Sequence, residues 1–123
     1  MKIQLLNRIA PVGLEQLGAG YEVGENVADP DGILVRSAAM HGMAFGDRLT
    51  AIARAGAGVN NIPIDRCSAA GIAVFNTPGA NANGVKELAV CALLLAVRDV
   101  LGGVEWVRGL HAPGIAGQVE KGK

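Results

Sequence analysis

The hydrophobic residues in the first part of the chain form five short runs that are continuous and do not alternate with polar residues. Continuous runs are typical of parallel strands that are covered on both faces. Turns containing glycine or proline separate these runs, and helical segments lie between several of them. The pattern predicts an α/β fold, an open parallel sheet with helices on its faces. The predicted strands are residues 2–6, 21–23, 33–35, 51–53 and 72–75, and the predicted helices are residues 11–17, a weakly helical 43–49, and 65–70.

One connection in this pattern is unusually short. Only residues 24–31 separate the second and third predicted strands. A crossover between parallel strands normally needs a dozen or more residues and usually contains a helix. We expect that the crossover helix has been lost here and that an extended loop makes the crossing; the alternative is a short, peripheral second strand.

Beyond the predicted sheet, residues 83–108 favour one long helix. Its central part, residues 88–97, is apolar on all sides, which predicts burial on all sides. This run is about half the length of a membrane span and therefore indicates a core helix. Residues 109–123 show no convincing element and are expected to be a connection. The chain thus divides into residues 1–82, 83–108 and 109–123, the organisation of an incomplete protein.

Composition excludes several classes of function. Eleven basic side chains balance eleven acidic ones, and aromatic residues are scarce, so we expect no nucleic-acid or membrane partner. Cys67 and Cys91 lie in apolar, helical contexts without metal-ligand spacing, which indicates two buried free thiols and no metal site. His41 and His111 have no carboxylate placed to orient them and are interpreted as solvent-exposed. These features are typical of a cytoplasmic protein.

Polar groups follow three successive predicted strands. Arg36 and Ser37 end the third, Arg54 and the glycine loop at 56–59 end the fourth, and an Asn-rich segment that includes Asn81 follows the fifth. Carboxyl ends of parallel strands meet at one edge, where such sheets bind ligands. Two cations, a hydroxyl and a glycine-rich backbone suit a small acid carrying a carboxylate or phosphate.

Each feature also has a purely structural interpretation. Arg36 would pair with Asp31 or Asp47 at the surface, and Asn81 would cap the long helix. The glycine loop after Arg54 would be an ordinary turn. No dinucleotide fingerprint is present, because Val23 and Asn61 occupy the positions where a third glycine would follow each Gly-x-Gly.

The sequences ILVRS at 33–37, ARAGAGVNN at 53–61 and GIAVFNTP at 71–78, with residues 81–88, closely resemble the NAD-dependent D-2-hydroxyacid dehydrogenases. The resemblance implies a flavodoxin-like substrate-binding domain, here its N-terminal portion, with a nucleotide-binding domain following the long helix. It implies oxidation of a phosphorylated hydroxy acid on the route to L-serine, with NAD as cofactor. The family's catalytic arginine, glutamate and histidine would lie outside this sequence, so we expect no catalytic residue and no NAD binding by this chain alone.

The resemblance also implies roles for individual residues. Substrate contacts carry over to Arg36, Ser37, Arg54, Gly58, Val59 and Asn81, and a contact with NAD carries over to Ala57. Apart from the resemblance, we expect a homo-oligomer, with the helix at 83–108 as a candidate contact. Two alternatives stay open: a stand-alone module for binding small anions or for dimerisation, and another D-2-hydroxyacid dehydrogenase with an unphosphorylated substrate.

Overall fold

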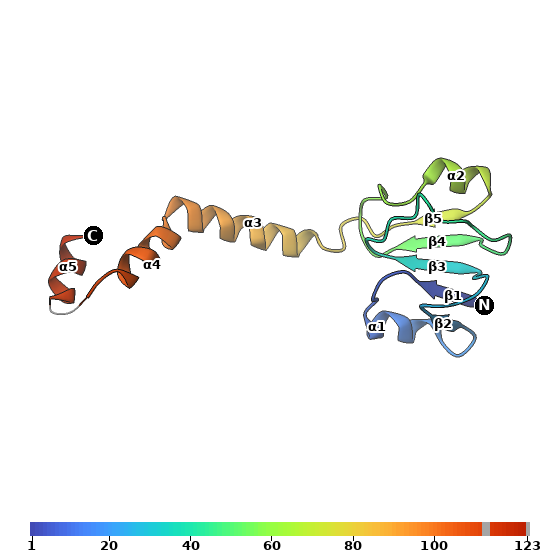
Figure 1. Cartoon of the computed structure of the whole chain (residues 1–123), viewed down its shortest axis with the longest axis horizontal. Coiled ribbons are helices and arrows are strands. Elements are labelled where there is room, and N and C mark those ends of the chain that lie inside the picture. The colour runs from blue at the N-terminus through green and yellow to red at the C-terminus, as the bar shows by residue number, and fades with distance from the viewer. Residues whose placement is uncertain (112–113, 123) are drawn as a thin grey trace. The chain divides into compact units, whose positions relative to one another are not determined.

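A computed structural model describes residues 1–111 and 114–122. It contains one sheet of five parallel strands in the order β2-β1-β3-β4-β5 (Figure 1). This is the flavodoxin-like strand order, so the predicted fold is confirmed. Contacts divide the chain into two units, Met1–Asn81, which holds the sheet, and Ala82–Lys123, whose described elements are helices. The strands are β1 Lys2–Leu5, β2 Glu22–Gly24, β3 Gly32–Val35, β4 Ala51–Arg54 and β5 Ala73–Phe75.

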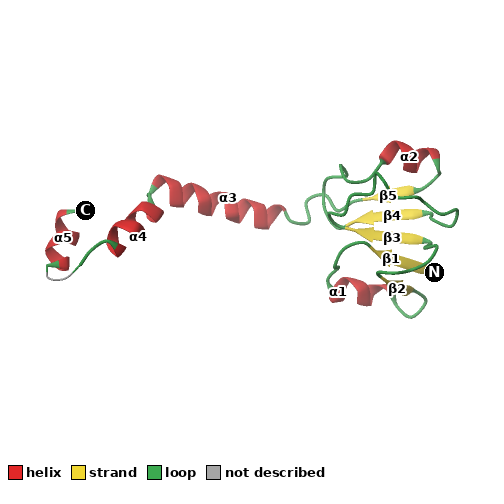
Figure 2. Cartoon of the chain, in the orientation of Figure 1, coloured by secondary structure: helices red, strands yellow, loops and turns green. Residues whose placement is uncertain are grey.

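Short helices connect two of the strand pairs (Figure 2). α1, Pro11–Leu14, continues into the 3₁₀ turn η1, Glu15–Leu17, between β1 and β2, and α2, Ile64–Ala69, lies between β4 and β5. Pro11 begins α1 because its fixed φ suits a first helical turn and its missing N–H costs nothing there. The predicted strands and these two helices are therefore confirmed, with ends that differ by at most one residue.

The core lies on one face of the sheet. Strand register places Ile33 beside Ile52 and Ile52 beside Val74 on that face. Buried side chains from α2 and the loops complete the cluster, which consists of Ile33, Val35, Met40, Leu49, Ile52, Ile62, Cys67 and Ile72. The opposite face is less covered, since Phe75 on β5 is 59% exposed. The expectation that the strands are covered on both faces is wrong for β5 within the described residues.

The predicted helix at 43–49 is absent, and α2 explains why. The Arg66 guanidinium donates to the backbone carbonyls of Met40, His41 and Met43 at 3.3, 3.0 and 2.6 Å. It also lies 4.3 Å from the centre of the Phe45 ring. Of these carbonyls, that of Met43 lies within the segment, and it is satisfied by Arg66 instead of by a helical N–H.

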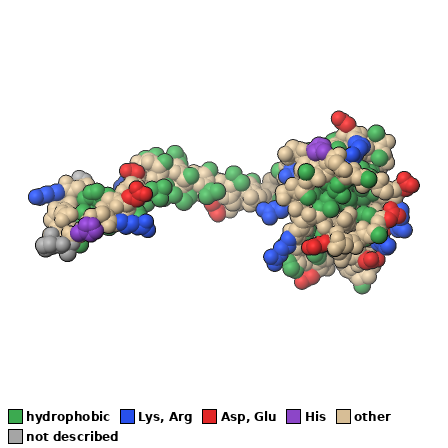
Figure 3. Space-filling view, in the orientation of Figure 1, with side chains coloured by type: hydrophobic (Ala, Val, Ile, Leu, Met, Phe, Trp, Pro, Cys, Tyr) green, Lys and Arg blue, Asp and Glu red, His purple; other side chains and the backbone are tan. Residues whose placement is uncertain are grey.

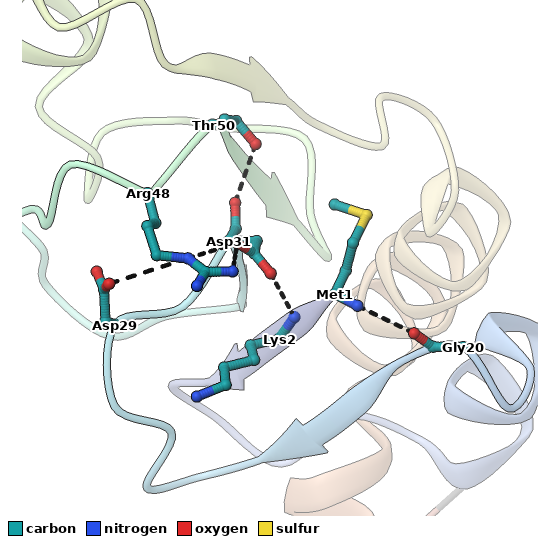
Figure 4. A network of polar contacts seen from close by, with 7 residues as sticks. All are labelled: Met1, Lys2, Gly20, Asp29, Asp31, Arg48 and Thr50. Carbon is teal, nitrogen blue, oxygen red and sulfur yellow. Dashed lines mark hydrogen bonds and ion pairs between the residues drawn. The ribbon is translucent and has the colours of Figure 1, made fainter.

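The short crossover is a loop without a helix, as expected, and a polar network holds its end (Figure 4). The Asp31 carboxylate accepts from the Lys2 N–H at 2.7 Å and from two nitrogens of Arg48 at 3.0 and 2.7 Å. The Asp31 carbonyl accepts from the N–H and hydroxyl of Thr50, both at 3.0 Å. These bonds connect the start of β3 to β1 and to the segment before β4, so side-chain contacts fix the loop where a helix would otherwise pack.

The helical unit contains α3 Ala82–Val97, α4 Val100–Arg108 and α5 Ile115–Lys121. One continuous helix over 83–108 was therefore a wrong expectation. Asp99 breaks it with a left-handed backbone (φ 44°, ψ 46°), and its side chain accepts from the Gly102 N–H at 3.3 Å as the N-cap of α4. A Cβ at Gly102 would meet the Asp99 carboxylate, so a larger residue there would displace the capping side chain. The presence of α5 also corrects the expectation of no element after residue 109.

Exposure in this unit differs from the prediction as well. No residue of α3 is buried; Leu88, for example, is 71% exposed and Leu93 62%. Figure 3 shows hydrophobic side chains along the surface of this helix. Burial on all sides is thus wrong within the described residues. Cys67 is buried as expected, but Cys91 on α3 is exposed. Among the described residues, no helix combines the length and apolar character that a membrane span requires.

Candidate functional site

Loops at the carboxyl edge of the sheet are joined to one another by hydrogen bonds. The four loops follow β1, β3, β4 and β5, and every one of these strands is parallel to its neighbours. The links involve Asn7 after β1, residues 36–38 after β3, Arg54 at the end of β4 with residues 56–58 after it, and residues 76–77 after β5. The predicted convergence of strand ends is therefore present in the geometry.

Asn7 organises the turn after β3. Its side-chain oxygen accepts three successive backbone N–H groups, those of Arg36, Ser37 and Ala38, at 2.8, 2.9 and 3.0 Å. Its amide nitrogen lies 3.5 Å from Ser37 Oγ. Three converging donors fix which end of the amide is the oxygen, since only the oxygen accepts. The turn that presents Arg36 and Ser37 is thus held by a residue that the sequence reasoning missed.

Arg54 ties the loops after β3 and β4 together. Its Nε donates to the Arg36 carbonyl at 2.9 Å, and its Nη1 donates to the Gly58 carbonyl. A guanidinium has five N–H donors, so three remain for other partners. Glycine allows this arrangement, because a Cβ at position 58 would lie only 2.8 Å from Nη1. Arg54 therefore fixes the distance between the two loops and keeps its charge at the edge.

The glycine loop is held by its carbonyl oxygens. The Gly56 carbonyl accepts from the Thr77 N–H at 3.0 Å, and the Ala57 carbonyl accepts from the Asn76 side chain at 2.7 Å. In the part of the chain that the structure describes, the N–H groups of Ala57, Gly58 and Val59 donate to no protein acceptor. Ala57 and Gly58 are exposed and Val59 is half-buried. Three successive free N–H groups are suited to an anionic ligand.

The remaining predicted residues are exposed and free for a ligand. Within residues 1–111 and 114–122, the Arg36 side chain forms no hydrogen bond or ion pair, because Asp31 pairs with Arg48 instead. Asn81 lies directly before α3 and its side chain also forms no described bond. His41 is exposed and its Nε2 lies 3.0 Å from the Asn60 carbonyl, and His111 is exposed too, as predicted.

Chemically, this edge offers one unpaired cation, one partly used cation, a hydroxyl and a row of free N–H groups. These are hydrogen-bond donors with net positive charge, the properties that recognise carboxylates and phosphates. Among the described residues, no cluster of three or more His, Cys, Asp or Glu side chains is placed to hold a metal ion. The arrangement is equipped to hold an acid in place, and it contains no described group positioned as a general acid or base.

The sequence profile described as the catalytic domain of D-isomer specific 2-hydroxyacid dehydrogenases matches residues 14–116. The chain belongs to this family. This D-2-hydroxyacid dehydrogenase chain is 36% identical to D-3-phosphoglycerate dehydrogenase from Mycobacterium tuberculosis over 77 residues. The aligned residues cover 60% of this chain and 15% of that protein. It is 46% identical to hydroxypyruvate reductase from Thermotoga maritima over 55 residues, 45% of this chain and 18% of that protein.

A solved structure supports the same assignment. NAD⁺-bound 3-phosphoglycerate dehydrogenase from Entamoeba histolytica superposes with a TM-score of 0.62 at 31% identity, covering 77% of this chain and 38% of that one. The D-2-hydroxyacid dehydrogenase chain described here thus spans between 15% and 19% of the length of the sequence relatives that it matches.

Proposed function

We propose that this chain is the substrate-binding portion of a D-3-phosphoglycerate dehydrogenase, an enzyme that oxidises 3-phosphoglycerate to 3-phosphohydroxypyruvate with NAD in cytoplasmic L-serine biosynthesis. The observation that carries the proposal is the row of free N–H groups at Ala57, Gly58 and Val59, linked through Arg54 to the loop of the unpaired Arg36. One loop offers neutral donors and the other offers full charge. That combination suits a ligand with a carboxylate at one end and a phosphate at the other.

In this proposal the two ends of the substrate have different partners. The carboxylate binds the N–H groups of Gly58 and Val59, which need no titratable side chain. The phosphate binds Arg36, Ser37 and Asn81, because an arginine and two neutral donors match its charge and its several oxygens. Arg54 holds both loops at a fixed separation and contributes positive charge to the middle of the site.

NAD enters the proposal only at one position. The sequence contains no Gly-x-Gly-x-x-Gly, so its residues do not form a dinucleotide site by themselves. Ala57 is exposed on the glycine loop and would touch the nicotinamide side of a cofactor held elsewhere in the protein. No step of hydride or proton transfer is assigned to a residue of this chain.

Self-association through the helical unit is part of the same proposal. Side chains of α3 and the start of α4 line an apolar groove of about 630 Å³, among them Val90, Leu94 and Val100. Lys86, Glu87 and Arg98 also line this groove. Pairing of two copies through the groove would cover its apolar side chains.

A second candidate has an observation of its own. The Thermotoga maritima relative with 46% identity is a hydroxypyruvate reductase, so the chain could belong to a D-2-hydroxyacid dehydrogenase with an unphosphorylated substrate. In that case Arg36 would have no phosphate to bind. The two candidates differ in one measurable quantity, the preference for 3-phosphoglycerate over D-glycerate.

Titration of the ¹⁵N-labelled chain with each acid tests the proposal. We expect 3-phosphoglycerate to shift the amide signals of Gly58, Val59 and Ser37, and D-glycerate to bind more weakly and to shift mainly the glycine loop. Arg36→Ala should weaken 3-phosphoglycerate binding about tenfold, the effect of losing one charge-assisted contact. Arg108→Ala, an exposed arginine of the helical unit, is the matched control. Equal affinity for both acids would favour the second candidate, and no shift with either would end the proposal.

A further inference from the structure

The turn that presents Arg36 and Ser37 depends on one side chain outside the predicted site. We infer that Asn7 is a positioning residue for ligand binding, and that it prepares the Ser37 hydroxyl to donate to an anion. This inference deepens the proposed function and rests on it.

Backbone geometry supplies the first step. Three successive N–H groups, from Arg36 to Ala38, converge on Asn7 Oδ1 within 3.0 Å. Without this acceptor, the N–H groups of an exposed turn would bind water, and the turn would be free to change shape. Because Asn7 follows β1 and the turn follows the neighbouring β3, the bond also joins two strand ends. The direction in which Arg36 and Ser37 leave the sheet is thereby set by Asn7.

The other end of the same amide supplies the second step. Asn7 Nδ2 has only donor hydrogens, so at 3.5 Å from Ser37 Oγ it can interact only with an oxygen lone pair. The hydroxyl hydrogen of Ser37 is then not used on Asn7 and is left to donate to another acceptor. A carboxylate or phosphate oxygen is such an acceptor. Asn7 therefore favours the orientation of Ser37 that an anionic ligand requires.

An aspartate at position 7 would hold the backbone turn equally well but would reverse this second effect. Its carboxylate would accept the same three N–H groups, with stronger charge-assisted bonds. It would also accept the Ser37 hydroxyl hydrogen and turn it away from the ligand. Its negative charge would in addition oppose an anion beside Arg36. Asn7→Asp thus separates the contribution to folding from the contribution to binding.

The experiment compares three variants of the full 123-residue chain, Asn7→Asp, Asn7→Ala and Asn26→Asp. Thermal unfolding and titration with 3-phosphoglycerate, followed by amide signals, are measured for each. Asn7→Asp should keep or raise the midpoint of unfolding and weaken binding about tenfold. Asn7→Ala should lower both the midpoint of unfolding and the affinity for 3-phosphoglycerate. Asn26→Asp introduces the same charge in the exposed crossover loop and should bind within about twofold of wild type, since salt screens distant charges.

A test in the Ser37→Ala background identifies the route. There, Asn7→Asp should weaken binding less than it does in the wild-type chain, because the hydroxyl that it would turn away is already gone. If Asn7→Asp binds 3-phosphoglycerate as wild type does, or if its effect is the same with and without Ser37, the inference is overturned while the proposed function stands. If the wild-type chain binds no 3-phosphoglycerate, the proposed function fails first and the role of Asn7 fails with it.

Discussion

Gly58→Ala tests whether Arg54 holds the glycine loop. A Cβ at position 58 would lie 2.8 Å from Arg54 Nη1, closer than real contacts allow, whereas the nearest other atom, Asn60 Oδ1, would lie 3.3 Å away. The guanidinium is the end of a flexible side chain, so it would move instead of the backbone. The result would be the loss of its bond to the Gly58 carbonyl.

The magnitude follows from two opposing terms. A hydrogen bond from a charged donor contributes about 1.5–3 kcal/mol, and the lower end applies here because the bond is exposed to solvent. Gly58 does not have a positive φ, so alanine fits its backbone and stabilises the chain by about 0.5 kcal/mol through the unfolded state. The net expectation is a loss of about 1 kcal/mol. For a domain of this size that lowers the midpoint of unfolding by roughly 4–8 °C.

A double-mutant cycle measured by urea unfolding isolates the cause. In an Arg54→Ala background there is no guanidinium to displace, so Gly58→Ala should become slightly stabilising, by about 0.5 kcal/mol. The control is Gly42→Ala, an exposed loop glycine whose added Cβ meets nothing within 4 Å. If Gly58→Ala costs the same in both backgrounds, its effect does not pass through Arg54, and the structural role given to that side chain is wrong.

Two further predictions concern titratable groups away from the site. The pKa of Asp31 is lowered first by the Lys2 N–H and then by Arg48, so its stabilising effect is present above about pH 4 and is lost as pH falls through the lower folded value. Asp31→Asn should therefore show a flatter loss of thermal stability toward acid, and an unchanged acid slope would contradict this. Burial raises the pKa of the Cys67 thiol, whereas Cys91 is exposed, so labelling of the native chain, diluted until it is monomeric, with a disulfide reagent should be fast at Cys91 and slow at Cys67. Cys91→Ser should remove the fast phase, and two equally fast thiols would contradict the assignment.

The strands were predictable because a local pattern decides them. A short, continuous apolar run, such as residues 33–35, is typical of a strand that lies between other strands in a parallel sheet. The break in the predicted long helix was not predictable in this way. Asp99 adopts a left-handed backbone and receives the Gly102 N–H, and neither property shows in hydrophobic periodicity, which continues through the break.

The site was predictable in outline for a similar reason. Strand ends carry ligands in parallel sheets, so Arg36 and Arg54 could be placed at one edge before any coordinates were known. The role of Asn7 could not be predicted in this way, because a single asparagine after a strand belongs to no recognisable sequence pattern. Its importance depends on β1 lying beside β3, and only the strand order supplies that fact. A search for polar residues after every predicted strand, the first included, would have found it.

The roles of the side chains at this edge follow one rule. Arg54 and Asn76 donate to carbonyl oxygens of residues 36, 57 and 58, so each clamp uses the acceptor half of a loop peptide. The N–H groups of residues 57–59 donate to no protein acceptor in the part of the chain that the structure describes, so they stay available to a ligand. The proposed anion site depends on glycine as well as on charge, because the missing Cβ at Gly58 leaves room for the Arg54 guanidinium beside the loop. This explains why the glycine loop, and no cluster of titratable residues, is the most visible functional signal in the sequence.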